Sequence, residues 1–317
     1  FGGPMYVIKN GLPKRMLPLA YFFALAGMIG CLPAFQSNQL IQITGDLAFS
    51  EIENFNIFGG LVLAGITGIV VIGGLKRIAE VATFLVPLMG SIYFGAMLIA
   101  LTLNLDQVFP AFKLILVDAF NGTAIAGGTF FGVLIYGVRR GAFSNEAGMG
   151  TESLVHGVAK VSDPVKQGLV AMTGPIFDTL IICTATALMI LISGVWETST
   201  SQGVTLTAEA FSMLLGNFGG FILFICVICF GLSTIFTYSY YGASCSRFLF
   251  GKFGMKFYIY LYILSIFIYS IVPIDIAINI ADGAFAMMAI PTLVSALWLA
   301  PKVMQASKNY FKLIGSY

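Results

Sequence analysis

A polar, glycine-rich stretch, residues 141–150, lies in the middle of a long apolar region and constrains the fold more than any other feature. Ser144, Asn145 and Glu146 give it a hydroxyl, an amide and a carboxylate, and three glycines accompany them. A continuous membrane helix avoids this mixture, because unpaired polar groups in hydrocarbon are costly. The stretch is either a polar loop between two spans or a membrane helix that breaks to bind a solute. We favour the broken helix.

The composition indicates that the chain lies in a membrane and not in water. Of the 317 residues, 58% are hydrophobic and only 9% are charged, against roughly 25% charged residues in ordinary globular domains. Several apolar runs reach the roughly 20 residues that a helix needs to cross a bilayer. The fold class is therefore an all-α polytopic membrane protein, surrounded by a lipid bilayer.

The apolar runs divide the chain into eight expected spans. Residues 1–16 are expected to form a polar lead, and residues 197–209 a polar loop. Most of the 16 Lys and Arg residues fall at one set of span ends, which the positive-inside rule assigns to the cytoplasm. Both ends of this chain are then cytoplasmic. The spans lie near residues 17–47, 57–75, 78–103, the broken segment around 141–150, 164–194, 216–249, 256–273 and 275–300.

Two arginines fit neither set of span ends. Arg139 and Arg140 lie within the fourth segment, directly before the expected break. Ionisable residues at such depth usually face a cavity or a partner, and Glu146 and Glu152 are the expected partners. If the span is shorter, the arginines are instead anchors at the membrane interface.

The residues around the break suit a small zwitterion such as an amino acid. A second half-helix that begins near 148–150 presents free N–H groups and a partial positive charge, which attract a carboxylate. Ser144 and Asn145 can hydrogen-bond a small polar solute, and Phe143 can shield it from water.

Two other polar groups lie at membrane depth. Gln36, Ser37 and Asn38 form either a second wall of the site or ordinary hydrogen bonds between helices. Ser233 and Thr234 offer hard oxygen ligands for a cation, although such hydroxyls often bond the preceding turn of their own helix.

The sequence disfavours several other functions. A serine nucleophile needs a base, and the one histidine, His156, lies in a basic segment that is predicted to be cytoplasmic, so no hydrolase site is visible. Cys226 and Cys229 form a single CxxC without a second pair, which argues against a metal site. No phosphate-binding glycine motif followed by Lys-Ser or Lys-Thr is present, and nothing indicates a nucleic-acid partner.

Several motifs resemble those of the alanine or glycine:cation symporter family. The central one is Arg140-Gly141-Ala142-Phe143-Ser144-Asn145-Glu146-Ala147-Gly148-Met149-Gly150. Further matches, in the same order along the chain, are Gly2-Gly3-Pro4-Met5-Tyr6, Gln36-Ser37-Asn38, Pro164-Val165-Lys166-Gln167-Gly168-Leu169, Asp178-Thr179-Leu180, Ser233-Thr234-Ile235, Ser239-Tyr240-Tyr241-Gly242 and Asp282 with Met288-Ala289-Ile290-Pro291.

The resemblance implies a leucine-transporter-like inverted-repeat fold. On that map the chain carries helices 3–10, and helices 1–2 are missing, so it is expected to be an N-terminally truncated single transporter domain. The first repeat, incomplete, covers 1–103, the second repeat 104–300, and a cytoplasmic tail 301–317. A monomer in the cell membrane is expected.

The resemblance also assigns roles to residues. Substrate binding falls to Gln36, Phe143, Ser144, Asn145, Gly148 and Tyr238, and sodium binding to Ser233 and Thr234. The implied function is sodium-coupled symport of alanine or glycine by alternating access, with Na⁺ as coupling ion and no cofactor. The alternatives are a membrane amino-acid sensor and a symporter of another small zwitterionic solute. The family commonly has Gly-Trp where this chain has Thr237-Tyr238, which leaves substrate size open.

Overall fold

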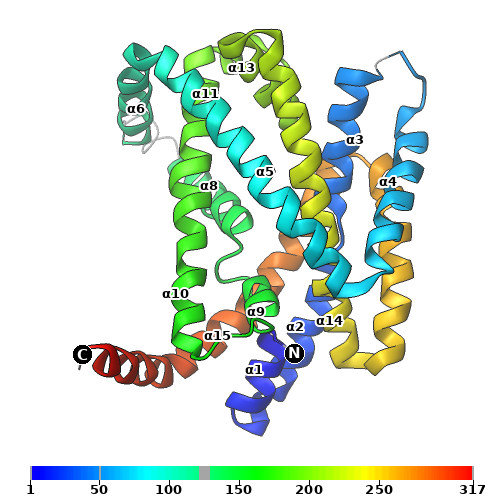
Figure 1. Cartoon of the computed structure of the whole chain (residues 1–317), viewed down its shortest axis with the longest axis vertical. Coiled ribbons are helices and arrows are strands. Elements are labelled where there is room, and N and C mark those ends of the chain that lie inside the picture. The colour runs from blue at the N-terminus through cyan, green and yellow to red at the C-terminus, as the bar shows by residue number, and fades with distance from the viewer. Residues whose placement is uncertain (1, 50, 121–128, 316–317) are drawn as a thin grey trace.

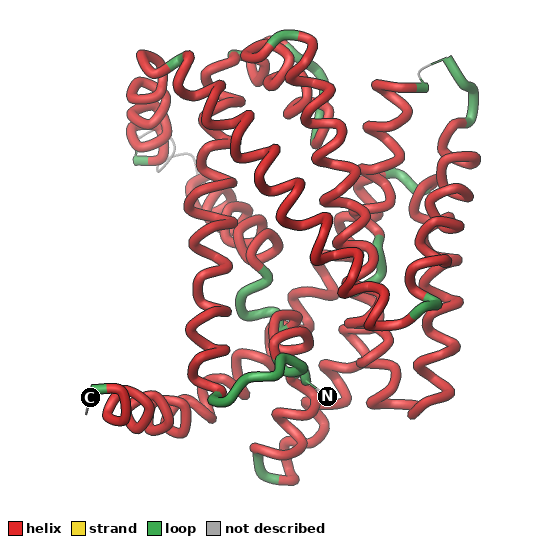
Figure 2. Tube along the Cα trace, viewed as in Figure 1, coloured by secondary structure: helices red, strands yellow, loops and turns green. Residues whose placement is uncertain are grey.

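Helices account for nearly all of the chain. The structure, a computed structural model, describes residues 2–49, 51–120 and 129–315, and these residues form helices but no strands. Figure 2 shows the helices in red, joined by short loops. In chain order they are α1 (Pro4–Gly11), the 3₁₀ turn η1 (Lys14–Met16), α2 (Leu17–Gly30), α3 (Ala34–Ala48), α4 (Phe55–Val71), α5 (Gly74–Leu103), α6 (Leu105–Ala119), α8 (Thr129–Asn145), α9 (Thr151–His156), α10 (Pro164–Pro175), the π-helical segment η2 (Ile176–Cys183), α11 (Thr184–Ser193), α12 (Val195–Thr198), α13 (Val204–Leu215), α14 (Asn217–Ile271) and α15 (Ile274–Ile314).

The apolar helices make this an all-helical, multi-pass membrane protein. Within the described residues, five helical segments are long and apolar enough to cross a membrane: Lys14–Ala48, Gly74–Leu103, Pro164–Ser193, Phe218–Ile271 and Ile274–Ile314. The helix α4 is also apolar but shorter. With α4, with α8 and α9 as one broken segment, and with α14 counted as two arms, the order of segments agrees with the expected spans.

The longest helix, α14, folds back on itself. Gly251 interrupts it with a φ of 69°, a value that favours glycine, and Figure 1 shows the two arms running in opposite directions at the right of the molecule. The arms are joined by the buried hydroxyl of Tyr262, which donates to the carbonyl of Ile235 at 2.6 Å. Both arms lie in the main core, where α14 packs against α2, α3, α4, α5 and α13.

The first long span is two helices rather than one. The helix α2 ends at Gly30 and α3 begins at Ala34, with Pro33 as the N-cap of α3. Because proline has no N–H to donate, it ends one helix and can precede the next. The span expected at residues 17–47 is therefore broken at residues 31–33.

The expectation of a polar lead at residues 1–16 is wrong. Residues 4–11 form the helix α1, which has Pro4 in its first turn and buries Met5 and Ile8 on one face. This face packs against α2 and α15. The two buried side chains are three residues apart, so they lie on the same side of a helix.

The expectation of a polar loop at residues 197–209 is also wrong for most of that range, because the last two residues of α12 and the first six residues of α13 lie there. The N-terminus of α13 is capped from a distant part of the chain: the N–H of Val204 donates to the side-chain carbonyl of Gln39 on α3, at 3.2 Å. Ala208 and Phe211 then bury the inner face of α13. A cap that lies 165 residues away cannot be seen in a local sequence pattern.

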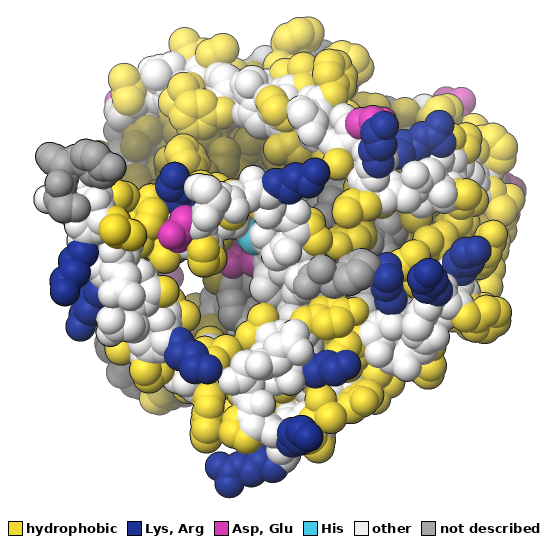
Figure 3. Space-filling view, turned by 60° about the horizontal axis from the view of Figure 1, so that its bottom comes forward, with side chains coloured by type: hydrophobic (Ala, Val, Ile, Leu, Met, Phe, Trp, Pro, Cys, Tyr) yellow, Lys and Arg dark blue, Asp and Glu magenta, His cyan; other side chains and the backbone are white. Residues whose placement is uncertain are grey.

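Basic side chains gather at the end of the molecule that holds both termini. Figure 1 places the N- and C-terminal ends together at the bottom, and Figure 3 turns this end forward and shows Lys and Arg side chains spread over it, with few acidic ones. The clustering on one face agrees with the pattern of charges in the sequence. That this face is cytoplasmic stays a prediction.

Candidate functional site

The break that the sequence predicts is present. The helix α8 ends at Asn145 and α9 begins at Thr151, with non-helical backbone between them. Glu146, Gly148 and Gly150 have φ values of 55°, 81° and 92°. A positive φ is uncommon for a residue other than glycine, so Glu146 is held in an unfavourable conformation at the start of the break.

Side chains support this irregular backbone. The carbonyl of Asn145's own side chain accepts a hydrogen bond from the N–H of Ala147, at 2.9 Å, which is the usual way in which asparagine stabilises a turn two residues on. Farther along, the hydroxyl of Thr292 on α15 donates to the carbonyl of Met149 at 3.3 Å. The break is thus fastened at both ends.

A π-helical segment supplies the polar partners of the break. The hydroxyl of Ser144 donates to the carboxylate of Asp178 on η2 at 2.5 Å, and the hydroxyl of Thr179 donates to the same oxygen at 3.2 Å. The side-chain amide of Asn145 donates to the Thr179 hydroxyl at 3.1 Å. Short π-helical segments inside α-helices often mark functional sites. The sequence analysis assigned no role to Asp178 or Thr179.

Two cavities meet at the break. Cavity A, of about 390 Å³, lies between α3, α8, α13 and α14, and its lining includes Gln36, Phe143, Ser144, Glu146, Thr234 and Tyr238. Cavity B, of about 350 Å³, lies on the side of α9 and α10, and its lining includes Ser144, Asn145, Glu146, Asp178, Ser233 and Thr234. Residues of α13 line cavity A and residues of α9 line cavity B, and Figure 1 shows α13 at the top of the molecule and α9 near the bottom.

The structure brings together most of the residues that the sequence analysis singled out. Gln36 and Phe143 line cavity A, Asn145 and Ser233 line cavity B, and Ser144, Thr234 and Tyr238 line both. Tyr238 and Thr234, which are four residues apart on α14, therefore line the same two cavities. Gly148 lines neither cavity; the nearest side chain to the space beside its Cα is Leu293 of α15.

The neighbouring polar residues have separate roles. Asn38 donates from its side chain to the carbonyl of Val272 at 2.7 Å, so it links two helices, whereas Gln36 lines cavity A. Ser233 donates to the carbonyl of Phe230 at 3.0 Å, within its own helix. Asn38 thus bonds between helices and Ser233 bonds its own helix, while substrate binding by Gln36 and cation binding by Ser233 and Thr234 stay predictions.

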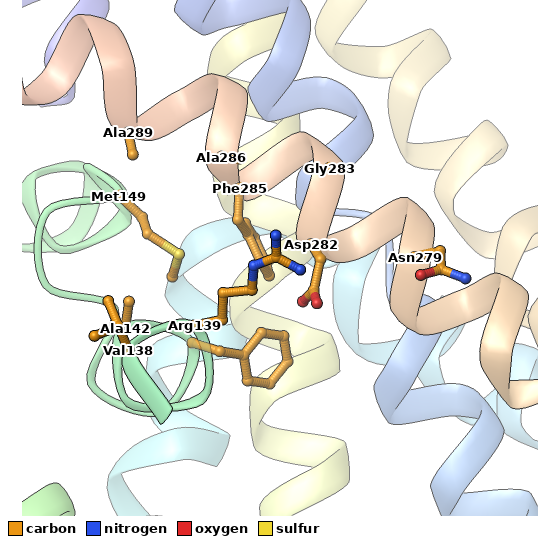
Figure 4. Close-up of a pocket in the computed structure, with 11 residues that line it drawn as sticks. Val138, Arg139, Ala142, Met149, Asn279, Asp282, Gly283, Phe285, Ala286 and Ala289 are labelled. Atoms are coloured by element: carbon orange, nitrogen blue, oxygen red, sulfur yellow. The ribbon is translucent and has the colours of Figure 1, made fainter. Parts of the chain in front are cut away.

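A third cavity, cavity C, lies between α8 and α15 (Figure 4). It has a volume of about 350 Å³, and Figure 4 shows the side chain of Arg139 pointing from α8 toward Asp282 on α15. Arg140 forms an ion pair with the same carboxylate. The expectation that Glu146 or Glu152 would pair with these arginines is wrong for Arg140, because its acidic partner is 142 residues away on another helix.

An aromatic cluster separates cavity C from cavity A. The ring of Phe143 lies edge-on to the rings of Phe35 and Phe285, with both centroid distances at 5.4 Å. The guanidinium of Arg140 lies 5.6 Å from the Phe143 ring. Phe143 lines both cavities, so its ring forms part of the wall between them.

The geometry describes a helix broken at mid-chain, lined by amide, hydroxyl and carboxylate groups and open to cavities on both sides. The sequence pattern of the sodium:alanine symporter family matches residues 1–315. The chain belongs to this family. Proteins of this sodium:alanine symporter family are transporters and not enzymes.

Individual relatives support the assignment to the sodium:alanine symporter family. The chain is 35% identical to the sodium/alanine symporter AgcS of Methanococcus maripaludis, over 98% of this chain and 69% of that protein. It is 35% identical to YflA, an uncharacterised transporter of Bacillus subtilis, over 98% of this chain and 66% of that protein. It is 30% identical to the amino-acid carrier protein AlsT of Bacillus subtilis, with 98% and 67% covered. The chain thus spans about two thirds of the length of these relatives.

Proposed function

We propose that this protein carries out sodium-coupled symport of small neutral amino acids, with alanine or glycine as the foremost substrates. The observation that carries the proposal is cavity A, at the break between α8 and α9. Gln36, Ser144 and Tyr238 line it together with the ring of Phe143. A cavity lined mostly by apolar groups, with a few convergent polar ones, is the usual form of a small-molecule site.

The size and chemistry of cavity A fit a small zwitterion. Its volume of about 390 Å³ is at the lower end of the range for ligand pockets. Amide and hydroxyl groups can hydrogen-bond both charged ends of an amino acid. The apolar rings leave room for a short aliphatic side chain. Alanine and glycine satisfy all three conditions.

Sodium is proposed to bind beside the hydroxyls of α14. Thr234 lines cavities A and B, and Ser233 lines cavity B. Hydroxyl and carbonyl oxygens are the ligands that hard cations prefer. Because Thr234 lies where the two cavities meet, a sodium ion bound to its hydroxyl is close to a substrate in cavity A.

Alternating access, in a monomer with a leucine-transporter-like inverted-repeat arrangement, is the proposed mechanism. Discontinuous helices at the centre of a transporter allow the surrounding bundle to rock around a fixed site. The break at residues 146–150, with cavities on either side of it, is where such motion needs to be centred. We place both termini of the chain in the cytoplasm, where the basic face of Figure 3 belongs by the positive-inside rule.

Uptake of labelled alanine tests this function directly. The protein at its native length is reconstituted into vesicles, and uptake is measured with an inward sodium gradient and with potassium in its place. Sodium-dependent accumulation is expected. Binding of alanine without uptake indicates a sensor instead. Uptake that depends neither on sodium nor on competing unlabelled alanine contradicts the proposal.

A further inference from the structure

Cavity A has an unbalanced charge. Among the described residues that line it, Glu146 is the only one with a formal charge, and cavity B has no Lys or Arg in its described lining. A carboxylate within a membrane-spanning segment is costly unless it meets a cation or another partner. We propose that the carboxylate of Glu146 binds the ammonium group of the transported amino acid. This inference rests on the function proposed above.

The nearby arginines do not neutralise Glu146. Arg140 is paired with Asp282, and Arg139 points toward the same residue in Figure 4, so both face α15. Asp282 therefore has its counter-charge inside the protein. Glu146, only a few residues farther along the chain, is left to receive its counter-charge from a solute.

The backbone fixes the position of the Glu146 side chain before any ligand arrives. Its φ of 55° is maintained by the bond between the Asn145 side chain and the N–H of Ala147, and by the bond from the N–H of Met149 to the carbonyl of Glu146, at 3.3 Å. The carboxylate also lies beside the hydroxyl of Tyr238. A group that is already held in its binding position loses little freedom when a ligand binds, which favours affinity.

The charge of Glu146 also determines the orientation of a zwitterion. The substrate's own carboxylate is repelled by Glu146, so the ammonium group faces the break. The side-chain amide of Gln36 on α3, which lines the same cavity, can donate to the substrate's carboxylate. A solute that lacks the ammonium group leaves Glu146 without a cation and therefore binds more weakly than alanine.

Glu146→Gln tests this assignment, because it removes the charge and keeps the shape. Glu197→Gln is the matched control, since Glu197 is exposed on α12 and lines neither cavity. Binding is measured at saturating sodium in the protein at its native length, with alanine, with alaninamide, which keeps the ammonium group, and with lactate, which has a hydroxyl in its place.

The expected pattern is specific to the ammonium group. Glu146→Gln lowers the affinity for alanine and for alaninamide by about tenfold or more, as expected for the loss of one charged hydrogen-bond partner. Lactate binding changes by no more than about twofold, so the preference for alanine over lactate falls by the same factor as the alanine affinity. Glu197→Gln matches the wild type.

Three outcomes overturn the assignment. The first is an unchanged affinity of Glu146→Gln for alanine, and the second is an equal loss of affinity for alanine and for lactate. The third is a change in the sodium concentration needed for sodium binding in the absence of amino acid, with the same preference for alanine over lactate as in the wild type. The last outcome makes Glu146 a sodium ligand. If wild-type protein does not bind alanine, the proposed function itself fails; if wild type binds alanine and Glu146→Gln binds it equally well, only the role of Glu146 fails.

A second measurement does not depend on whether the variant folds. A carbodiimide is used to label carboxyl groups in the wild-type protein, and the labelled residues are located by mass spectrometry. Alanine is expected to protect Glu146 from labelling by about tenfold, as site occupancy demands at saturation, and lactate is not. Labelling of Glu146 that is the same with and without alanine contradicts the proposal.

Discussion

The break between α2 and α3 is closed by bonds of its own backbone, whereas the break between α8 and α9 is held in addition by side chains of other helices. At the first, the N–H groups of Cys31 and Leu32 bond the carbonyls of Gly27 and Ile29, both at 3.0 Å, and the turn is buried. At the second, Thr292 of α15 and Thr179 of η2 hold the chain.

This difference supports the proposal that the second break, and not the first, responds to the substrate. A turn that satisfies its own backbone depends on few neighbours. A turn that is fastened to α15 and to η2 has to move when those helices move, and in return it can move them. Coupling of this kind requires an element with two arrangements that a ligand can bias.

The largest expected effect is on the stability of the second break. Gly150→Ala introduces a side chain at a φ of 92°, and its Cβ lies 2.5 Å from Pro4 and 2.6 Å from Thr292. Left-handed backbone and overpacking together cost about 2–5 kcal/mol, so thermal unfolding in detergent should occur at a markedly lower temperature. Gly148→Ala, where the nearest atom is 3.6 Å away, should lose only the backbone part, about 1–2 kcal/mol. Equal losses of stability in the two variants would show that Gly150 is not closely packed against Pro4 and Thr292.

The next effect is on substrate binding at the same break. Asn145→Ala removes the acceptor that holds Ala147 and the donor to Thr179, and should weaken alanine binding by about 1–3 kcal/mol without preventing membrane insertion. Thr179→Val keeps the bond that holds Ala147 and removes the bond from Asn145 together with the bond from Thr179 to Asp178, and it should have a smaller effect. Equilibrium binding at saturating sodium measures both. Unchanged affinity in Asn145→Ala would remove this residue from the site.

A smaller effect is expected on the sodium concentration that transport requires. Thr234→Val keeps the shape of the side chain and deletes one oxygen, so half-maximal transport should require more sodium, by about fivefold for about 1 kcal/mol. Transport should recover at high sodium. The control is Thr173→Val, because Thr173 is exposed and bonds its own helix. A sodium dependence that does not move would make Thr234 a packing residue.

The smallest effect concerns substrate size. Tyr238 is 3% exposed and lines cavity A, so Tyr238→Trp should narrow the cavity and favour glycine and alanine over serine and threonine. Discrimination by one small group amounts to about 1–3 kcal/mol, which shifts a preference without switching it. Competition against labelled alanine gives the answer, with the exposed Tyr260→Trp as the matched control. Identical competition profiles would show that Tyr238 does not contact the substrate.

The sequence predicted the break and most of its surroundings because these depend on local chemistry. Glycines and a polar triplet within an apolar segment have few structural solutions in a membrane. Gln36 and Thr234, from two other helices, were placed by resemblance, and the structure brings both to cavity A.

Features that depend on distant partners were missed. The ion pair of Arg140 with Asp282 joins residues 142 positions apart, and the Gln39 cap of α13 joins residues 165 positions apart. Charge spacing favoured the nearer Glu146 and Glu152 as partners. The polar composition of 197–209 suggested a loop, although a remote cap can begin a helix in such a segment.

The π-helical segment η2 amounts to one extra residue wound into the span from Pro164 to Ser193. An α-helix turns about 100° per residue, since it has 3.6 residues per turn. Deleting one residue between Thr179 and Cys183 is therefore expected to leave a regular helix whose two halves have rotated by about that angle relative to each other. With α11 kept in place against α13, Asp178 would swing away from Ser144. An insertion of a single codon is then sufficient to turn the carboxylate of Asp178 toward the break, while the face of α11 that packs against α13 stays unchanged.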